Sequence, residues 1–412
     1  MMAVPERTAQ NVEPLKQYTK AEQAFFDRWE AQKVDLTANG SADAREAAIG
    51  GLKLYGLPTR RVESWHYTDL RAKLLDLDFP EASNDAPPVQ PLVQVKDGVS
   101  AVGFNASKFS PDRVELSFQG SDDAVGQINA AFADDGLNCT IDAGASFDIP
   151  LEFATIVNGG QKHRRHTIVV EEGANVTFVE RQVGAGGMGT SVTYLEVGPK
   201  ADVTYVVVQQ TSVASTHLAQ INATIAADAK LTIFVLNAGG SLVRQEVRVR
   251  VEGENADFQL RGVNLIGDGQ HVDVTMDLKH LVPNTTSEEI IRNIVAGKGH
   301  GVFQGRIAVD RIAQKTDAKM ACNTLLLTDE GDFSTKPELE IFADDVACGH
   351  GATFTDLEPS HMFYLMSRGI PEREAQALLV KGFVDEIVED LDDERLHEAL
   401  VGIIDGWLDK NA

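Results

Sequence analysis

The densest cluster of reactive side chains in the sequence is Cys348-Gly349-His350-Gly351. In an extended segment, Cys348 and His350 lie two residues apart and point to the same face. A thiolate and an imidazole are good ligands for soft and borderline metals such as iron or zinc. The flanking glycines have no side chains, so a partner can approach the backbone closely. A lone Cys and a lone His are more often packing residues, and this cluster alone is a weak indication of a metal site.

A third soft ligand, Cys322, precedes Cys348 by 26 residues and His350 by 28. Both separations are close to one period of the repeat described below. On a regular coil, Cys322 is expected in the layer adjacent to His350, with neighbouring strands about 4.8 Å apart. The spacing therefore predicts one patch of three soft ligands. Such a patch falls short of a closed four-ligand site, so a metal held there needs further ligands from another chain or a small molecule.

Other reactive residues give weaker indications. His271 and Asp273 are two residues apart, with His280 further on, and an outward polar face explains them better than a metal site. Residues 162–166 form the most basic stretch, but five residues do not make a nucleic-acid site on so acidic a chain. The sequence contains no P-loop, GxSxG, HExxH or strand-borne GxGxxG motif. An autonomous ATPase, hydrolase or dehydrogenase therefore has little support.

A repeat of 27 to 29 residues organises the middle of the chain. Small residues recur at this spacing, and large apolar residues follow them at offsets of two and four. These offsets are typical of strands, because alternate strand residues point to the same face. A second strand-like run, rich in Val, Thr, Ile and Tyr, follows in each repeat. The small residues are Ala145, Ala174, Ala201, Ala229 and Ala256.

A fixed period in this range predicts a β-solenoid. Two strands of about seven residues and two bends fill roughly 28 positions, so each coil should contain two strands. We expect a flattened, right-handed parallel β-helix. The alternative is a β-sandwich with accidental regularity, but a sandwich gives no reason for the register to hold across five units.

Helical regions flank the predicted β core. We divide the chain into an N-terminal helical region with a linker (1–85), the parallel β-helix core (86–355) and a C-terminal helical region (356–412). Thr19 and Glu22 form a capping box ahead of the first helix.

Prolines mark a linker over 84–91, and an apolar stripe from Ala375 to Leu391 at three- and four-residue spacing predicts a C-terminal helix. These ends could cap the solenoid, dock a partner, or both.

Composition narrows the class of protein. A net charge of −25 over 412 residues argues against binding to nucleic acid or an anionic membrane. Three cysteines are too few for a disulfide framework. No apolar run reaches the length of a membrane span, and Met1–Gln10 lacks the hydrophobic region of a signal peptide. We therefore expect a cytoplasmic protein rather than a secreted β-helix enzyme.

The segment from Thr335 to Thr353, which includes the CGHG cluster, closely resembles the signature of the SufD family. SufD proteins are scaffold subunits of the SUF iron–sulfur cluster assembly machinery. Further similar segments lie at 58–70, 313–318 and 363–370. The resemblance extends from residue 58 to about residue 390, and its C-terminal block is highly specific.

The resemblance implies a right-handed parallel β-helix between helical ends, in a SufBCD complex with the paralogous scaffold SufB and the ATPase SufC. It implies that the C-terminal helical region docks SufC and that this subunit is not itself an enzyme. A transient iron–sulfur cluster would form at the interface with SufB, with none bound tightly to the isolated chain. The family's ligand histidine corresponds to His350, and its neighbouring cysteine to Cys348. An isolated chain could also form a homodimer.

Cys322 departs from the SufD pattern, because the SufB paralogue has its functional cysteine at the matching place. Gly351 stands where SufB should have Glu, which favours SufD. Cys322 is therefore either a further cofactor-binding residue or incidental. Two other functions stay open at this point: a β-helix carbohydrate-active enzyme, and a purely structural solenoid without bound metal.

Overall fold

The computed structural model describes residues 17–37, 42–75, 91–93, 104–108 and 122–411. Within these ranges the chain forms two compact units. The first comprises Met1–Asp78 and Ser110–Asp134, and the second comprises Phe79–Phe109 and Asp135–Ala412. No helix in the described part of the chain is both long enough and apolar enough to cross a membrane.

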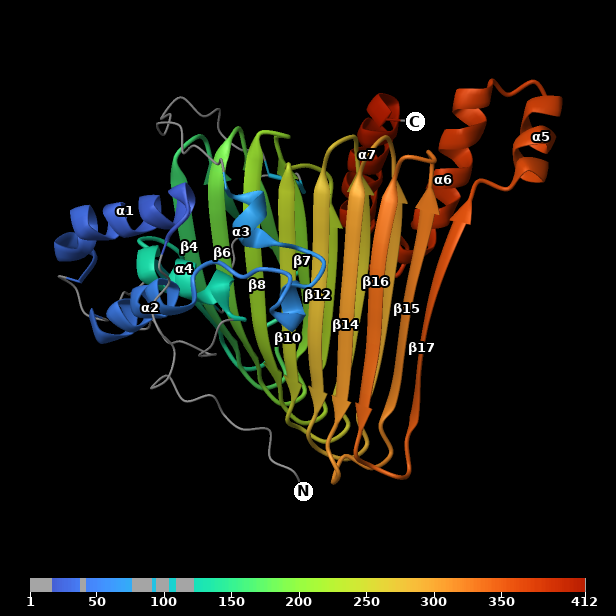
Figure 1. The fold of residues 1–412 in the computed structure, drawn as a ribbon. Helices are drawn as coiled ribbons and strands as arrows, with labels where there is room; N and C mark the ends of the chain where they lie inside the picture. The colour runs from blue at the N-terminus through green and yellow to red at the C-terminus, as the bar shows by residue number, and fades with distance from the viewer. Residues whose placement is uncertain (1–16, 38–41, 76–90, 94–103, 109–121, 412) are drawn as a thin grey trace. The chain divides into compact units, whose positions relative to one another are not determined.

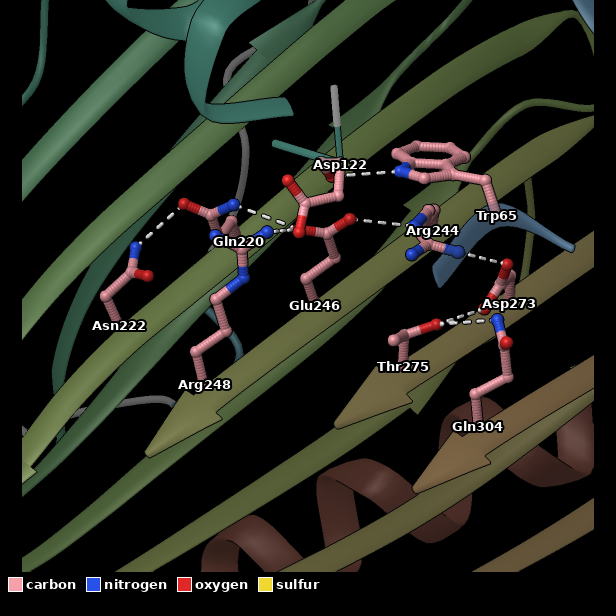
Figure 2. A network of polar contacts seen from close by, with 10 residues as sticks. All are labelled: Trp65, Asp122, Gln220, Asn222, Arg244, Glu246, Arg248, Asp273, Thr275 and Gln304. Carbon is pink, nitrogen blue, oxygen red and sulfur yellow. Dashed lines mark hydrogen bonds and ion pairs between the residues drawn. The ribbon is translucent and has the colours of Figure 1, made fainter. Parts of the chain in front are cut away.

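The first unit is helical. The predicted capping box is confirmed, because the Thr19 amide donates to Glu22 Oε2 at 2.7 Å and the Glu22 amide donates to Thr19 Oγ1 at 3.2 Å. The Trp65 indole N–H donates to the carbonyl of Asp122 at 3.0 Å (Figure 2). Arg45 donates to the carbonyl of Ala133 at 2.7 Å, beside the end of the last helix. The helices are α1 (Lys20–Thr37), α2 (Ala42–Tyr55), η2 (Glu63–Trp65), α3 (Leu70–Lys73) and α4 (Ala124–Phe132).

The β core predicted over 86–355 includes α4 (Ala124–Phe132), which the structure places in the helical unit. The repeat that predicted the core begins only at Ala145. Residues 84–90 of the predicted linker lie outside the described residues.

The second unit is a parallel β-solenoid with two strands per coil, as the repeat predicts (Figure 1). The nine-stranded sheet has the order β1-β2-β4-β6-β8-β10-β12-β14-β16, and the eight-stranded sheet has the order β17-β15-β13-β11-β9-β7-β5-β3. All pairs are parallel except β1–β2. The strands are β1 (Phe104–Lys108), β2 (Leu137–Ile141), β3 (Leu151–Val157), β4 (Gln161–Val170), β5 (Asn175–Gly184), β6 (Gly187–Val197), β7 (Asp202–Thr211), β8 (Ser215–Ile225), β9 (Lys230–Asn237), β10 (Leu242–Val251), β11 (Asp257–Ile266), β12 (His271–His280), β13 (Thr286–Val295), β14 (His300–Val309), β15 (Asp317–Leu326), β16 (Asp332–Ile341) and β17 (Ala347–Asp356).

Apolar side chains from both sheets fill the interior of the solenoid. Rows such as Val176, Val203, Leu231 and Phe258 stack in register through successive coils and are fully buried. Each is two residues after an alanine of the predicted series, and Ala174, Ala201, Ala229 and Ala256 are themselves buried in this core. A small side chain fits where the bend brings the backbone close to the interior.

One bend of each coil contains a residue with a left-handed backbone conformation. At six of these residues the amide donates to a carbonyl of the next coil, as Asp228 does to Glu254 at 2.9 Å; the other five are Gly144, Gly173, Lys200, Asn284 and Lys315. The bend therefore repeats together with the strands and keeps the coils in step. The residues are Gly144, Gly173, Lys200, Asp228, Asn255, Asn284 and Lys315.

The C-terminal segment forms α5 (Pro359–Ser367), α6 (Glu372–Val388) and α7 (Glu394–Asn411). Helices α6 and α7 pack an apolar face on the outer side of the eight-stranded sheet, which confirms the helix predicted from the apolar stripe (Figure 1). Arg261 of β11 is paired with Asp390 and Glu288, both at 2.6 Å, and Arg292 of β13 donates to Glu386 at 2.9 Å. Helix α5 follows the last strand and has no buried residue.

The left-handed bends lead to a test of the coil geometry. Replacing Asn255 with Val should lower the free energy of unfolding by about 1–2 kcal/mol, because a β-branched residue fits the left-handed region poorly. Asn255→Gly should be nearly neutral. The neighbouring exposed Glu254 supplies the control, and Glu254→Val should change stability by less than about 0.5 kcal/mol. Equal melting temperatures for Asn255→Val and Glu254→Val would contradict this account of the bend.

Candidate functional site

The last coil leaves the end of the solenoid open. Among the described strands, β16 pairs only with β14 and β17 pairs only with β15, so both are edge strands. All residues of β17 are at least partly exposed, including those that face inward. We call the two edges of β16 and β17, with the inward face of β17, the open end.

The open end contains two of the three predicted ligands. Cys348 and His350 lie on the extended strand β17 and share its inward face, as predicted. Cys348 is partly buried against the apolar core, whereas His350 is exposed. A Cβ atom added to Gly349 or Gly351 would meet no atom within 4 Å, so the other face of this segment is bare backbone.

The prediction that Cys322 lies in the layer adjacent to His350 is confirmed, but the register differs by two residues. Cys322 is on the neighbouring strand β15, but its partner in register is Ala352, and the residue opposite His350 is Met320. Cys348 pairs with Ala318. The reason is coil length, since β15 and β17 are offset by 30 residues rather than the expected 28.

Cys322 is also buried, at 1% exposure, whereas His350 faces solvent. Among the described residues, no three His, Cys, Asp or Glu side chains come together closely enough to hold a metal ion.

Burial keeps the thiols protonated near neutral pH. It raises the pKa of Cys322 to about 11, although hydrogen bonds from Asn293, Thr335 and Thr324 act in the opposite direction. Burial also raises the pKa of Cys348. A metal ion that binds either sulfur would have to displace a proton.

A buried carboxyl group near the open end did not emerge from the sequence. Glu289 of β13 faces inward at 0% exposure, and neither carboxyl oxygen has a hydrogen-bond partner among the described residues. It lies in the same row as Met320 and His350. Burial raises the pKa of Glu289 to about 8. Side chains alternate between the two faces of β13, and this alternation places Glu289 on the inward face. The sequence could not reveal this, because the alanine series that sets the register ends before β13.

The remaining candidates are structural. His271 and Asp273 alternate along β12 with the core residues Val272 and Val274, so they lie on its outward face. This agrees with the interpretation of these residues as an outward polar face. The His271 ring stacks on His300, with centroids 4.8 Å apart. His280 instead faces the interior, where its ring nitrogens contact Thr285 Oγ1 at 2.8 Å and Ser287 Oγ at 3.2 Å.

Asp273 belongs to a polar network that crosses β8, β10, β12 and β14 on the outward face of the nine-stranded sheet (Figure 2). Arg244 lies at its centre, where it is paired with Asp273 and donates to Glu246 at 2.9 Å. Charged and amide groups of successive coils satisfy one another in this network, so it stabilises the stacking of coils. Its other members are Gln220, Asn222, Arg248, Thr275 and Gln304.

Comparison with known proteins agrees with this geometry. Residues 154–383, which run from β3 into α6 and include the open end, match the family described as "SUF system FeS cluster assembly, SufBD core domain". The chain belongs to the SufBD family. The predicted resemblance is thereby confirmed, and the family assigns the chain to iron–sulfur cluster assembly.

Individual SufBD relatives cover most of the chain. It is 29% identical to the Escherichia coli "Iron-sulfur cluster assembly protein SufD" over 85% of this chain and 89% of that protein. It is 26% identical to a Synechocystis SufBD family protein over 90% of this chain and 93% of the relative. The chloroplastic protein ABCI7 of Arabidopsis thaliana is 30% identical over 58% of this chain and 52% of that protein.

Glu289 makes stability depend on pH in a predictable direction. Its pKa is about 8 in the folded chain against an ordinary value of 4.5, so the folded state holds a proton that the unfolded state loses between these values. Stability should therefore fall as pH rises from about 4.5 to 8, on the order of 1.4 kcal/mol per pKa unit. Glu289→Gln should flatten the fall in melting temperature across this window.

Exposed Glu254 again provides the control, because Glu254→Gln should leave the pH dependence unchanged. Parallel pH profiles for wild type and Glu289→Gln would contradict the assignment of Glu289 as a neutral buried acid.

Proposed function

We propose that the protein is a non-catalytic scaffold subunit for de novo iron–sulfur cluster assembly, acting with a SufB-type paralogue and a SufC-type ATPase. Family membership and the similarity to SufD of Escherichia coli support the general role. The observation that carries the specific proposal is the open end, where an exposed imidazole lies beside unpaired strand edges.

The strand edges supply the means of association. Strands β16 and β17 each present one row of backbone N–H and C=O groups without a paired strand. Such an edge accepts a further strand from another chain. A paralogue with the same solenoid could extend both sheets across the junction, and a second copy could do so when the chain is isolated.

The ligand set suits a transient cluster. His350 is exposed at the junction and Cys348 lies two residues away on the same face. Because they do not complete a site alone, the cluster would take its other ligands from the partner. An assembly site shared between subunits can also release its product when the subunits move, which a closed four-ligand site resists.

Helix α5 supplies a docking surface for the ATPase. Phe363 and Tyr364 are 75% and 56% exposed, and the helix buries none of its residues. Large apolar side chains gathered on one exposed helix are typical of an interaction site. All three cysteines are free thiols, which fits the reducing cytoplasm that we propose as the location.

The central test replaces His350 with Ala. Cluster formation during anaerobic reconstitution with iron, sulfide, the SufB-type paralogue and the SufC-type ATPase should fall by more than about tenfold, because a lost ligand costs more than a lost outer-shell partner. Cluster absorbance measures the effect, and circular dichroism should show an unchanged fold. His300→Ala, on the outward face of β14, is the matched control. Undiminished assembly by His350→Ala would remove this residue from the mechanism and favour a purely structural solenoid.

A separate test addresses ATPase docking. Phe363→Ala should weaken binding of the SufC-type ATPase by about 30-fold, the effect of losing roughly 2 kcal/mol at an interface hot spot. Isothermal titration calorimetry measures the dissociation constant. Val213→Ala, which truncates an exposed apolar side chain in a bend of the solenoid, should bind as wild type does. Equal affinities for both variants would show that α5 is not the docking surface.

A further inference from the structure

A file of side-chain amides runs through the interior of the solenoid along its axis. Asn237 Nδ2 donates to Asn264 Oδ1 at 2.8 Å, and Asn264 Nδ2 donates to Asn293 Oδ1 at 2.7 Å. Asn293 Nδ2 then donates to Thr324 Oγ1 at 3.1 Å and contacts Cys322 Sγ at 3.4 Å. These asparagines occupy one row in register on β9, β11 and β13. Asn293 Nδ2 also donates to the Asn323 carbonyl at 3.3 Å, so the file ends at three acceptors, of which the sulfur of Cys322 is one.

The file continues in the other direction to a carboxylate. Gln245, from the facing sheet, donates to Asn237 Oδ1 at 3.0 Å and to Gln182 Oε1 at 2.8 Å. Gln182 Nε2 in turn donates to Glu180 Oε1 at 3.0 Å. We call Gln182, Gln245, Asn237, Asn264 and Asn293 the amide file.

The direction of the hydrogen bonds is the informative feature. From Gln245, amide donors point along the file toward Glu180 on one side and toward Cys322 on the other. The N–H end of an amide is the positive end of its dipole, and bonds in a chain polarise one another. One end of the file meets a carboxylate, the natural acceptor for such donors. The other end meets a sulfur atom in the penultimate strand of the eight-stranded sheet.

Burying these amides in the interior of the solenoid costs free energy. All five side chains are 2% exposed or less, and neighbouring rows show that apolar side chains fill the same interior. A buried amide requires partners for its polar groups, whereas an aliphatic side chain requires none. A continuous file over several coils is thus a specific arrangement rather than a product of general packing.

We propose that the amide file positions Cys322 and directs amide donors at its sulfur, so that Asn264 and Asn293 are positioning residues for Cys322 as a soft ligand in cluster assembly. This inference rests on the proposed function. It assigns Cys322 a role in the interior behind the open end. Cys322 does not lie opposite His350, but hydrogen bonds hold its sulfur in a fixed environment.

The first experiment reads the sulfur directly. In a full-length chain with Cys139→Ser and Cys348→Ser, the Raman S–H band comes from Cys322 alone. Asn264→Leu, which breaks the file one coil away from Asn293 without touching the thiol, should shift this band. Leu260→Val alters the same inward face of β11 without touching the file and should leave the band in place. Asn264→Gln should restore it, because Gln182 and Gln209 occupy the same row.

The second experiment measures assembly in the reconstituted complex with an otherwise wild-type chain. Asn264→Leu should lower cluster formation by about tenfold or more, as for outer-shell partners of metal ligands. Added to Cys322→Ser, it should cause no further loss. If Asn264→Leu unfolds, Gln245→Met, two hydrogen bonds further away, replaces it in both experiments.

The outcomes separate the two proposals. An unshifted S–H band, or normal assembly by Cys322→Ser and Asn264→Leu while His350→Ala is defective, would overturn the inference and leave the proposed function intact. Normal assembly by His350→Ala would instead count against the proposed function.

Discussion

Parallel hydrogen bonding between successive coils is the constraint on which the rest of this structure depends. It fixes each residue beside the residue one coil earlier, so that distant stretches of chain form continuous rows. The row Val176, Val203, Leu231 and Phe258 makes core in this way, and the asparagines at 237, 264 and 293 make a polar file by the same rule. The register of the strands therefore decides which reactive side chains lie together in this fold.

The same ladder explains why the two ends of the solenoid differ. In the nine-stranded sheet, β1 closes the first edge by pairing antiparallel with β2. At the other end, β16 and β17 each have one edge that no other described strand pairs with, and His350 lies exposed on the final strand. A parallel coil cannot satisfy its own last edge, so this end keeps backbone groups with which a further strand could pair. The unpaired edges and the exposure of His350 thus arise from one geometric fact.

The limits of prediction follow from coil length. The alanines at the bends predict two strands per coil, since the early coils keep offsets of 27 or 28 residues. Beyond Ala256 the offsets become 29, 31 and 30, because the bends lengthen and no alanine marks them. Because of these longer coils, Cys322 is two residues out of register with His350, although both residues were correctly expected on adjacent strands. The longer coils also hid Glu289, whose inward position depends on the register of β13.

The interior of the solenoid contains polar side chains at positions where apolar packing alone would favour aliphatic ones. Most inward rows are aliphatic, and an aliphatic residue in place of Glu289 or Asn264 would avoid the cost of burying a polar group. Glu289 lies in the row of His350, and the amide file runs from Gln182 on β5 to Asn293 beside Cys322, so buried polar groups occur over several coils and reach the last ones. Local rules of packing are broken mainly where a protein acts. In this solenoid the buried polar groups extend to the coils directly behind His350, so the interior there departs from purely apolar packing.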